Sequence, residues 1–302
     1  MPSAKAFLMS ILLATLWSQS AAAEDAFGPQ GAEGEPLREQ AWLVPSGDPG
    51  VASHAFLFRP AGQGPFRLAV IAHASTQNTV LRVMMPQPQY RPLAALLVAK
   101  GFAVLVPERP GHGVTGGKYL EDQDGCDGAD YIHAGRATAD EISAAMTYLR
   151  EQPFIRHDGT VIIGHSAGGW GALALASADP ADISAIIAFA PGRGGQPNGV
   201  PDQICAPHTL IAAAAEFGRG ARVPVSWLVA ANDGYFPPDF SRKMADAFRS
   251  GGGKADFHVL PPYDSEGHWM GETENGVKHA SAELDRALKG LTPQPVARTK
   301  KP

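Results

Sequence analysis

The sequence predicts an α/β protein with a mainly parallel, twisted sheet of about eight strands and helices on both faces. Short apolar runs, typical of strands buried on both sides, alternate along the chain with segments of helical periodicity. Such alternation implies parallel strands joined by helical crossovers. In addition, one apolar run ends in a glycine-rich turn, "GHSAGG" at 164–169, which a segment of small residues follows.

The composition is that of a globular protein. The chain has 302 residues, of which 44% are hydrophobic and 18% charged. This length suffices for one large α/β domain or two smaller ones. The net charge is −5 and no basic stripe is visible, so we do not expect nucleic acid as a partner.

The N-terminus has the pattern of a signal peptide, which we assign to residues 1–23. Lys5 supplies a positive charge, Ala6–Trp17 is an apolar core, and Ala21–Ala23 fits the small-x-small rule for cleavage before Glu24. We therefore expect a secreted or periplasmic protein without stable membrane insertion after cleavage. An uncleaved membrane anchor is the alternative.

The rest of the chain divides into three parts. Residues 24–50 are rich in Gly, Pro and Glu, and we expect a loosely held N-terminal arm there. Residues 51–291 carry the strand and helix patterns and form the predicted single domain. Residues 292–302 are polar and contain proline, which predicts a flexible tail.

The individual elements follow from hydrophobic periodicity and helix boundaries. Strands are expected at 51–60, 66–74, 102–108, 160–165, 183–191, 223–233 and 255–262, and helices at 90–101, 138–152, 167–178, 239–251 and 276–291. Thr138 and Glu141 are spaced as a capping box, which predicts a helix beginning there. The stretches 109–137 and 191–222 fit no regular element, and whether they form a lid stays open. Both follow strands, so we expect them at the carboxyl edge of the sheet.

Ser166 is the candidate nucleophile. Gly-x-Ser-x-Gly is a weak pattern in a chain with 34 Gly, but here an apolar strand precedes it and a small-residue helix follows it. Gly164 and Gly168 are expected because side chains there would collide in so sharp a turn. The backbone N–H of Ala167 would open the helix and face an oxyanion.

A serine nucleophile needs a base, and the base needs a group that orients it. Asp233 directly follows one predicted strand and His268 lies in the loop after the last one, so both belong to the same sheet edge as Ser166. Asp264 is the rival acid. His279, His258 and His165 are the rival bases; we expect the first on the surface of a helix, the second packed in a strand and the third packed behind the turn.

With these residues the sequence resembles the α/β-hydrolase superfamily, and more narrowly its dienelactone-hydrolase-like and carboxylesterase branches. The resemblance covers roughly residues 50–290 and rests on "GHSAGG", on "DGYFP" at 233–237, on "GHW" at 267–269 and on "ERPGHG" at 108–113. The chain differs from the family in two turns. His73-Ala74-Ser75 stands where His-Gly-x is usual, and Pro110 stands where Gly is common.

The resemblance implies the α/β-hydrolase fold and acyl transfer without a cofactor. Ser166 would attack a carbonyl, His268 would accept its proton, and Asp233 would orient the imidazole. The backbone N–H groups of Ala167 and Ser75 would bind the oxyanion.

The expected substrate is a small-molecule ester. Tyr235, Phe236 and Trp269 adjoin triad positions and are candidates to line an acyl pocket, whereas we expect Trp170 in the core. A peptidase or a lactone hydrolase on the same triad remains an alternative. A catalytically silent hydrolase fold that serves as a binding protein is the alternative from another class.

The remaining motifs concern bonds and cofactors. Export favours a disulfide between Cys126 and Cys205 over two separate buried thiols, and in the family's strand order it would tie the rim of the active site. Arg193 is expected to be a solvated loop residue. Gly111–Gly116 matches the dinucleotide fingerprint, but no helical pattern opens inside it. No His-x-x-x-His pair occurs, and we expect no metal site.

Overall fold

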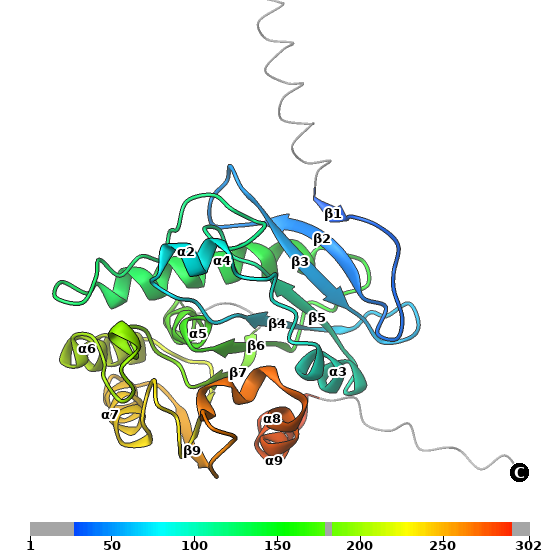
Figure 1. Cartoon of the computed structure of the whole chain (residues 1–302). Helices are drawn as coiled ribbons and strands as arrows, with labels where there is room; N and C mark the ends of the chain where they lie inside the picture. The colour runs from blue at the N-terminus through cyan, green and yellow to red at the C-terminus, as the bar shows by residue number, and fades with distance from the viewer. Residues whose placement is uncertain (1–26, 179–182, 292–302) are drawn as a thin grey trace, which may run out of the picture.

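The computed structural model describes residues 27–178 and 183–291 and places a sheet between two layers of helices (Figure 1). Within these residues the sheet has nine strands in the order β1-β2-β3-β5-β4-β6-β7-β8-β9. The strands are β1 (Gly28–Pro29), β2 (Gln40–Pro45), β3 (Ala52–Phe58), β4 (Arg67–Ala72), β5 (Phe102–Pro107), β6 (Thr160–His165), β7 (Ile183–Phe189), β8 (Val225–Ala230) and β9 (Ala255–Leu260).

The sheet is parallel from β5 to β9, and β1, β2 and β3 extend it in antiparallel fashion. This confirms the predicted fold class, although the strand number is nine rather than about eight. The expected loose arm at 24–50 is the reason for the difference. Gln40, Trp42 and Val44 of β2 are buried in alternation with more exposed neighbours, and the strand pairs with β3 along its whole length. A half-buried strand therefore forms there.

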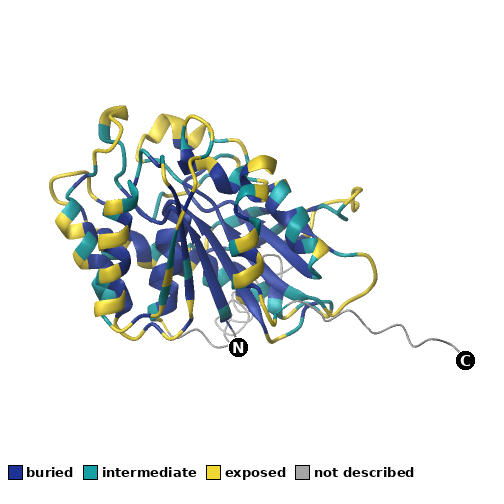
Figure 2. Cartoon of the chain, turned by 90° about the horizontal axis from the view of Figure 1, so that it is seen from below, coloured by how far each residue is buried: buried dark blue, intermediate teal, exposed yellow. Residues whose placement is uncertain are grey.

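The helices cover both faces of the sheet (Figure 1). They are α2 (Thr79–Val83), α3 (Arg91–Ala99), α4 (Tyr131–Arg150), α5 (Ala167–Ser177), α6 (Pro207–Gly218), α7 (Pro238–Ser250), α8 (Glu274–His279) and α9 (Ser281–Ala287), with 3-10 turns η1 (Pro197–Gly199) and η2 (Gly267–Glu272). Strand β4 shows how the two layers share the sheet. Leu68 and Val70 pack in the core under α4 to α7, while Ala69 and Ile71 pack in the core under α3, α8 and α9. Figure 2 shows the strands as the buried centre of the molecule.

Helix α4 begins earlier than the capping box predicts, so that prediction is wrong. The carboxylate of Asp130 accepts a hydrogen bond from the His133 N–H at 2.8 Å and caps the helix there. Thr138 lies inside the helix, fully buried, and its hydroxyl donates to the Ala134 carbonyl oxygen. The stretches expected to be irregular thus contain the first turns of α4 and, after η1, the whole of α6.

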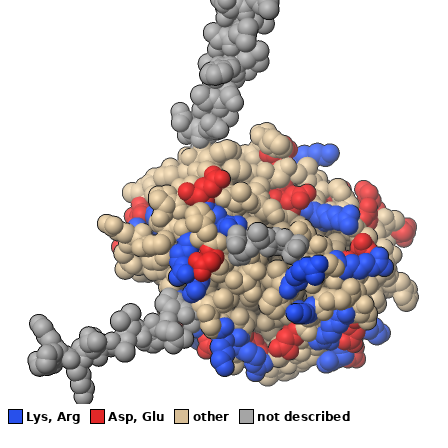
Figure 3. Space-filling model, turned by 180° about the vertical axis from the view of Figure 1, so that it is seen from behind, with Lys and Arg blue, Asp and Glu red and all other residues tan. Residues whose placement is uncertain are grey.

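Two further expectations concern the chain ends. The helix predicted at 276–291 is split into α8 and α9 at Ala280. The predicted signal peptide and the predicted tail lie outside the described residues. None of the helices in the described ranges combines the length and the apolar character needed to cross a membrane. On the face shown in Figure 3, basic and acidic side chains are intermixed.

Candidate active site

Ser166 occupies the sharp turn between β6 and α5. Its backbone has φ 53° and ψ −116°, a region that L-residues rarely adopt and that costs about 1–3 kcal/mol. The neighbouring strand holds this conformation, because the Ser166 N–H donates to the Phe189 carbonyl oxygen at 2.9 Å. The Ser166 carbonyl in turn accepts from the Trp170 N–H at 2.9 Å. Trp170 itself is fully buried in the core, as predicted.

The glycines on each side of Ser166 are geometric requirements of this turn. A Cβ atom on Gly164 would lie 2.5 Å from the Gly168 carbonyl oxygen. A Cβ atom on Gly168 would lie 2.1 Å from the carbonyl oxygen of Ala72, at the end of β4. Such distances are far below van der Waals contact, so only glycine lets the helix approach both strands.

Asp233 and His268 form a buried pair beside Ser166. The Nδ1 atom of His268 lies 3.1 Å from Oδ2 of Asp233. The other oxygen, Oδ1, accepts hydrogen bonds from the N–H groups of Tyr235 at 2.9 Å and Phe236 at 2.8 Å. Because Nδ1 faces a carboxylate, we assign the ring proton to Nδ1, which leaves the Nε2 lone pair available.

Ser166 and His268 line one cavity with a volume of about 570 Å³. In this conformation no described residue forms a hydrogen bond with Ser166 Oγ; catalytic hydrogen bonds are often long in unliganded sites. The cavity walls come from the loops after β4, β5, β7, β8 and β9, at the carboxyl edge of the sheet. This is where parallel α/β sheets bind ligands.

The two residues expected to supply oxyanion donors, Ala167 and Ser75, also line this cavity. Ala167 is the first residue of α5, so the helix leaves its N–H free of an intrahelical partner. Ser75 lies in the loop after β4, and its Oγ is 2.7 Å from Nε2 of His112. A side-chain bond therefore anchors the loop that presents the Ser75 backbone.

Two buried neutral histidines support that loop. Burial and the nearby charge of Arg109 lower the pKa of His112 to about 3. Its Nδ1 lies 3.0 Å from the Arg109 carbonyl oxygen and donates to it, so Nε2 accepts the Ser75 hydroxyl. His73 is similar: burial and Arg109 hold its pKa well below the ordinary value, and its Nε2 accepts the Arg109 N–H at 3.1 Å. Sequence reasoning missed His112, whose "GHG" context resembles only a glycine-rich turn.

The rival acid and two of the three rival bases lie away from the cavity that Ser166 lines. Asp264 is exposed and its carboxylate accepts from the N–H of the next residue. His279 is near the end of α8 and bonds through Nε2 to the Pro261 carbonyl oxygen. Nε2 of His258 lies 2.8 Å from Oδ2 of Asp256, so the side chain does not pack inside the strand, because β9 is an edge strand. None of the three lines the cavity.

Glu266 links the loops of the two triad candidates, and sequence reasoning missed it. Its Oε1 accepts the N–H of His268 at 3.0 Å and the N–H of Gly234 at 3.0 Å. Its Oε2 accepts from the Gln196 side chain at 3.2 Å. The only sequence signal is the helix-cap position of Glu266 before η2. Through these bonds Glu266 connects the loop that carries Asp233 to the loop that carries His268.

Aromatic and apolar side chains form one side of the cavity. Tyr235, Phe236 and Trp269 all line it, and the ring of Tyr235 stacks on His268 with centroids 4.2 Å apart. Trp269 is 38% exposed at the mouth. Leu81 of helix α2 also lines the cavity and is 59% exposed, because α2 turns its apolar side chains outward and buries Arg82.

Arg193 is buried, contrary to the expectation of a solvated loop residue. Its guanidinium forms an ion pair with Glu121, which also binds Arg109 at 2.6 Å, and all three side chains are almost fully buried. Arg193 also donates to the Thr138 hydroxyl at 2.9 Å. The loop at 109–130 thus supplies a buried carboxylate that makes an inward-facing arginine possible.

The two cysteines form a disulfide, with their Cα atoms 4.8 Å apart. Cys126 and Cys205 both line the cavity, so the bond ties the loop after β5 to the loop after β7 at the rim. The predicted disulfide and its predicted place are both found here.

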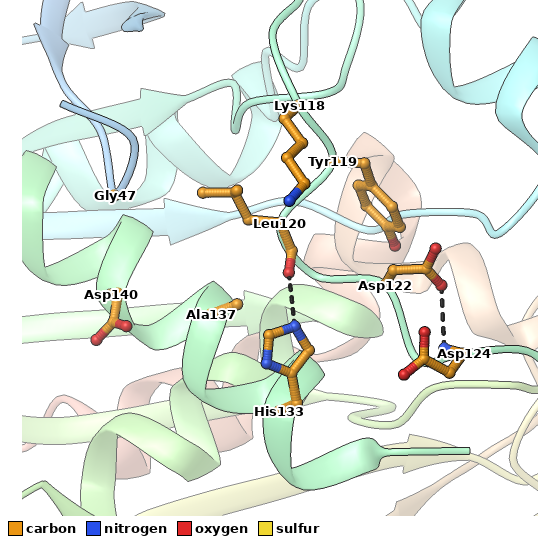
Figure 4. Close-up of a pocket in the computed structure, with 9 residues that line it drawn as sticks. All are labelled: Gly47, Lys118, Tyr119, Leu120, Asp122, Asp124, His133, Ala137 and Asp140. Carbon is orange, nitrogen blue, oxygen red and sulfur yellow. Dashed lines mark hydrogen bonds between the residues drawn. The ribbon is translucent and has the colours of Figure 1, made fainter. Parts of the chain in front are cut away.

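Figure 4 shows a second pocket, with a volume of about 480 Å³. Its lining residues are Gly47, Lys118, Tyr119, Leu120, Asp122, Asp124, His133, Ala137 and Asp140. The hydroxyl of Tyr119 accepts from Arg193 at 3.0 Å and lies 3.5 Å from Ser75 Oγ, so Tyr119 stands between the two pockets. Across the described ranges, no three His, Cys, Asp or Glu side chains are grouped so that they could hold a metal ion.

Part of the chain matches the model of a known protein family. Residues 87–219, less than half of the chain, match the sequence model of a family described as serine aminopeptidase, S33. No curated protein matches the sequence.

Many solved structures are similar in fold. An esterase from Pyrococcus furiosus is 12% identical, with a TM-score of 0.58 over 89% of this chain and 99% of that one. A protein assigned as a dienelactone hydrolase from Klebsiella pneumoniae is 15% identical, with a TM-score of 0.54 over 85% and 100% of the two chains. A puromycin-hydrolyzing peptidase from Mycobacterium tuberculosis is 17% identical, with a TM-score of 0.56 over 88% of this chain and 42% of that one. At these identities the likeness concerns the fold. The sheet order, the turn around Ser166 and these likenesses together show that the chain has the α/β-hydrolase fold.

Proposed function

We propose that the protein is an exported serine hydrolase that cleaves carboxylic esters through Ser166, Asp233 and His268. One observation carries the proposal: a serine with a strained backbone shares a cavity with a histidine whose Nδ1 is bound to a buried carboxylate. A nucleophile, a base and a group that orients the base are the three components that serine acyl transfer requires.

In this mechanism Ser166 Oγ attacks the ester carbonyl while His268 Nε2 accepts the hydroxyl proton. The backbone N–H groups of Ala167 and Ser75 stabilise the oxyanion, and loss of one such donor typically costs about 3–4 kcal/mol of barrier. His268 then protonates the leaving alcohol, which departs and leaves an acyl-enzyme. Water, deprotonated by His268, hydrolyses the acyl-enzyme and restores Ser166. Asp233 keeps the imidazole tautomer throughout.

The cavity lining favours an ester substrate over a peptide with a free amino terminus. Of the described residues that line it, none is Asp or Glu, and the one charged side chain among them is Arg193. The free α-ammonium group of an aminopeptidase substrate would therefore meet no carboxylate to pair with. The aromatic side chains and Leu81 suit an apolar acyl group instead.

Export fits the disulfide, since such bonds persist in oxidising compartments. The predicted cleavage after Ala23 is tested by sequencing the N-terminus of the mature protein from the secreted or periplasmic fraction, which we expect to begin at Glu24. A mature chain that still begins at Met1 would contradict the signal-peptide assignment.

The activity is tested with a panel of p-nitrophenyl esters, a lactone and aminoacyl p-nitroanilides. We expect hydrolysis of the esters by the wild-type protein and none by folded Ser166→Ala. Preferential cleavage of the anilides would support the peptidase alternative, and preferential cleavage of the lactone would support a lactone hydrolase. If the folded wild-type protein cleaves none of them, a silent binding protein becomes the better account.

A further inference from the structure

The hydroxyl group of Tyr90, just before α3, lies where three loops of the active site meet. It accepts a hydrogen bond from the N–H of Ala74, the residue before Ser75, at 3.2 Å. It is also 2.9 Å from Nδ1 of His165 and 3.0 Å from Oε1 of Glu272, at the end of η2. The Tyr90 hydroxyl thus connects three segments: the loop of Ala74 and Ser75 (the oxyanion loop), the turn that holds Ser166, and the loop that carries His268.

His165 extends this connection to the candidate base. It directly precedes Ser166, is buried, and its Nε2 lies 2.8 Å from the carbonyl oxygen of His268. Its ring centroid is 5.1 Å from that of His268 and 5.6 Å from that of Trp269. The position of the base is therefore tied to the residue next to the nucleophile, although the two are about a hundred positions apart in the chain.

The hydrogen-bond partners of His165 indicate which of its ring nitrogens carry a proton. Nε2 of His165 faces a carbonyl oxygen and must carry a proton to bind it. Nδ1 lies 3.0 Å from Oε1 of Glu272, which is an acceptor when the carboxyl is ionised. Burial acts to raise the pKa of Glu272, but the hydrogen bonds from His165 and Tyr90 outweigh it and hold that pKa below its ordinary value. Both ring nitrogens then donate.

We propose that His165, held as an imidazolium by Glu272 and Tyr90, is a positioning residue that fixes His268 relative to Ser166 and the oxyanion loop. The titratable groups that face its ring are Glu272, Tyr90 and His268. The protonation state of His165 does not depend on whether the protein is an active hydrolase, whereas its positioning role rests on the function proposed above. Displacements of about 1 Å at a catalytic group can lower a rate by roughly a hundredfold.

The kinetic test uses Glu272→Gln and Tyr90→Phe, which remove one charge and one hydroxyl with little change of shape. We expect kcat for a p-nitrophenyl ester to fall by roughly 10- to 100-fold with KM changed by less than about twofold. Glu274→Gln and Tyr148→Phe are matched controls outside the cluster and should retain wild-type kcat. Wild-type kcat in both folded test variants would overturn the positioning role.

The protonation state is tested in the unaltered protein by ¹⁵N NMR of labelled histidine with assigned resonances. At neutral pH we expect both ring nitrogens of His165 to show the shifts and attached protons of an imidazolium. A neutral ring with an unprotonated Nδ1 would overturn the proposal, whether or not the variants fold. If the wild-type protein lacks esterase activity but His165 is an imidazolium, the proposed function is wrong, whereas the protonation state assigned to His165 is correct.

Discussion

Both carboxylate oxygens of Asp233 lie within hydrogen-bond distance of Nδ1 of His268, Oδ2 at 3.1 Å and Oδ1 at 3.3 Å, and Oδ1 also accepts from the two backbone N–H groups that follow Asp233. The side chain of Asp233 is therefore fixed before any substrate binds, and with it the tautomer of His268.

The first prediction follows from this fixed carboxylate. Asp233→Asn presents an amide to Nδ1 and favours the wrong tautomer, so kcat for a p-nitrophenyl ester should fall by roughly 10⁴-fold. Asp264→Asn changes the exposed rival acid in the same way and should leave kcat within about twofold of wild type. A large loss in Asp264→Asn together with an active Asp233→Asn would transfer the acid role to Asp264.

The second prediction concerns stability in acid. Burial and Arg109 lower the pKa of His112 to about 3, against an ordinary value of about 6.5 in the unfolded chain. Between these values the unfolded state binds one proton more, so the free energy of unfolding falls as the pH falls, by up to roughly 1.4 kcal/mol per pH unit from this group.

Urea unfolding at a series of pH values between about 4.5 and 6.5 checks this acid dependence. His112→Gln should show a shallower decline in the free energy of unfolding than wild type. His157→Gln, at an exposed position, should show the wild-type slope. Equal slopes in wild type and His112→Gln would mean that His112 takes up a proton in the folded protein.

The third prediction concerns the acyl chain. Leu81→Ser removes apolar surface at the cavity mouth, and a fully buried leucine is worth about 1.5–3 kcal/mol. Since Leu81 is partly exposed, we expect kcat/KM for octanoyl esters to fall by roughly fivefold and that for acetyl esters to stay unchanged. Val259→Ser, on the edge strand β9, is the matched control. Equal losses for acetyl and octanoyl esters would exclude Leu81 from the acyl site.

The fourth prediction concerns the disulfide. Its cysteines are 79 positions apart, and closing a loop of that size stabilises by about 4–5 kcal/mol in the chain-entropy account. The variant with both Cys126→Ser and Cys205→Ser should lose about that much free energy of unfolding. Non-reducing peptide mapping of the wild type should recover the two cysteine peptides as one species. Two free thiols would show that Cys126 and Cys205 are not bonded to each other.

The parallel strands and the turn around Ser166 could be predicted because they are local patterns. Apolar runs report burial on both faces, and Gly164 and Gly168 mark the close approach of helix and strand. Strand β2 escaped prediction because it lies in a stretch rich in Gly, Pro and Glu and is soon followed by "GDPG", which resembles a loop. Its pairing with β3 makes it regular. Helix α4 begins earlier than predicted because Asp130 caps it. Thr138 forms a buried hydrogen bond instead of acting as the cap.

The candidate triad was predictable from order and strand ends, but the residues that hold it were not. Glu266, Glu272 and Tyr90 carry no motif of their own, and each becomes informative only when distant loops meet. Arg193 shows the same limit. Its sequence context, "PGRGG", resembles an exposed loop, while the carboxylate that buries it is Glu121, 72 positions earlier in the chain.

The most direct test of the central claim is covalent labelling with a fluorophosphonate probe, followed by mass spectrometry of the labelled peptide. Folded wild-type protein should carry one label, on Ser166, and Ser166→Ala should carry none. A folded wild-type protein that takes no label, or that is labelled on another serine, would contradict the assignment of Ser166 as the nucleophile.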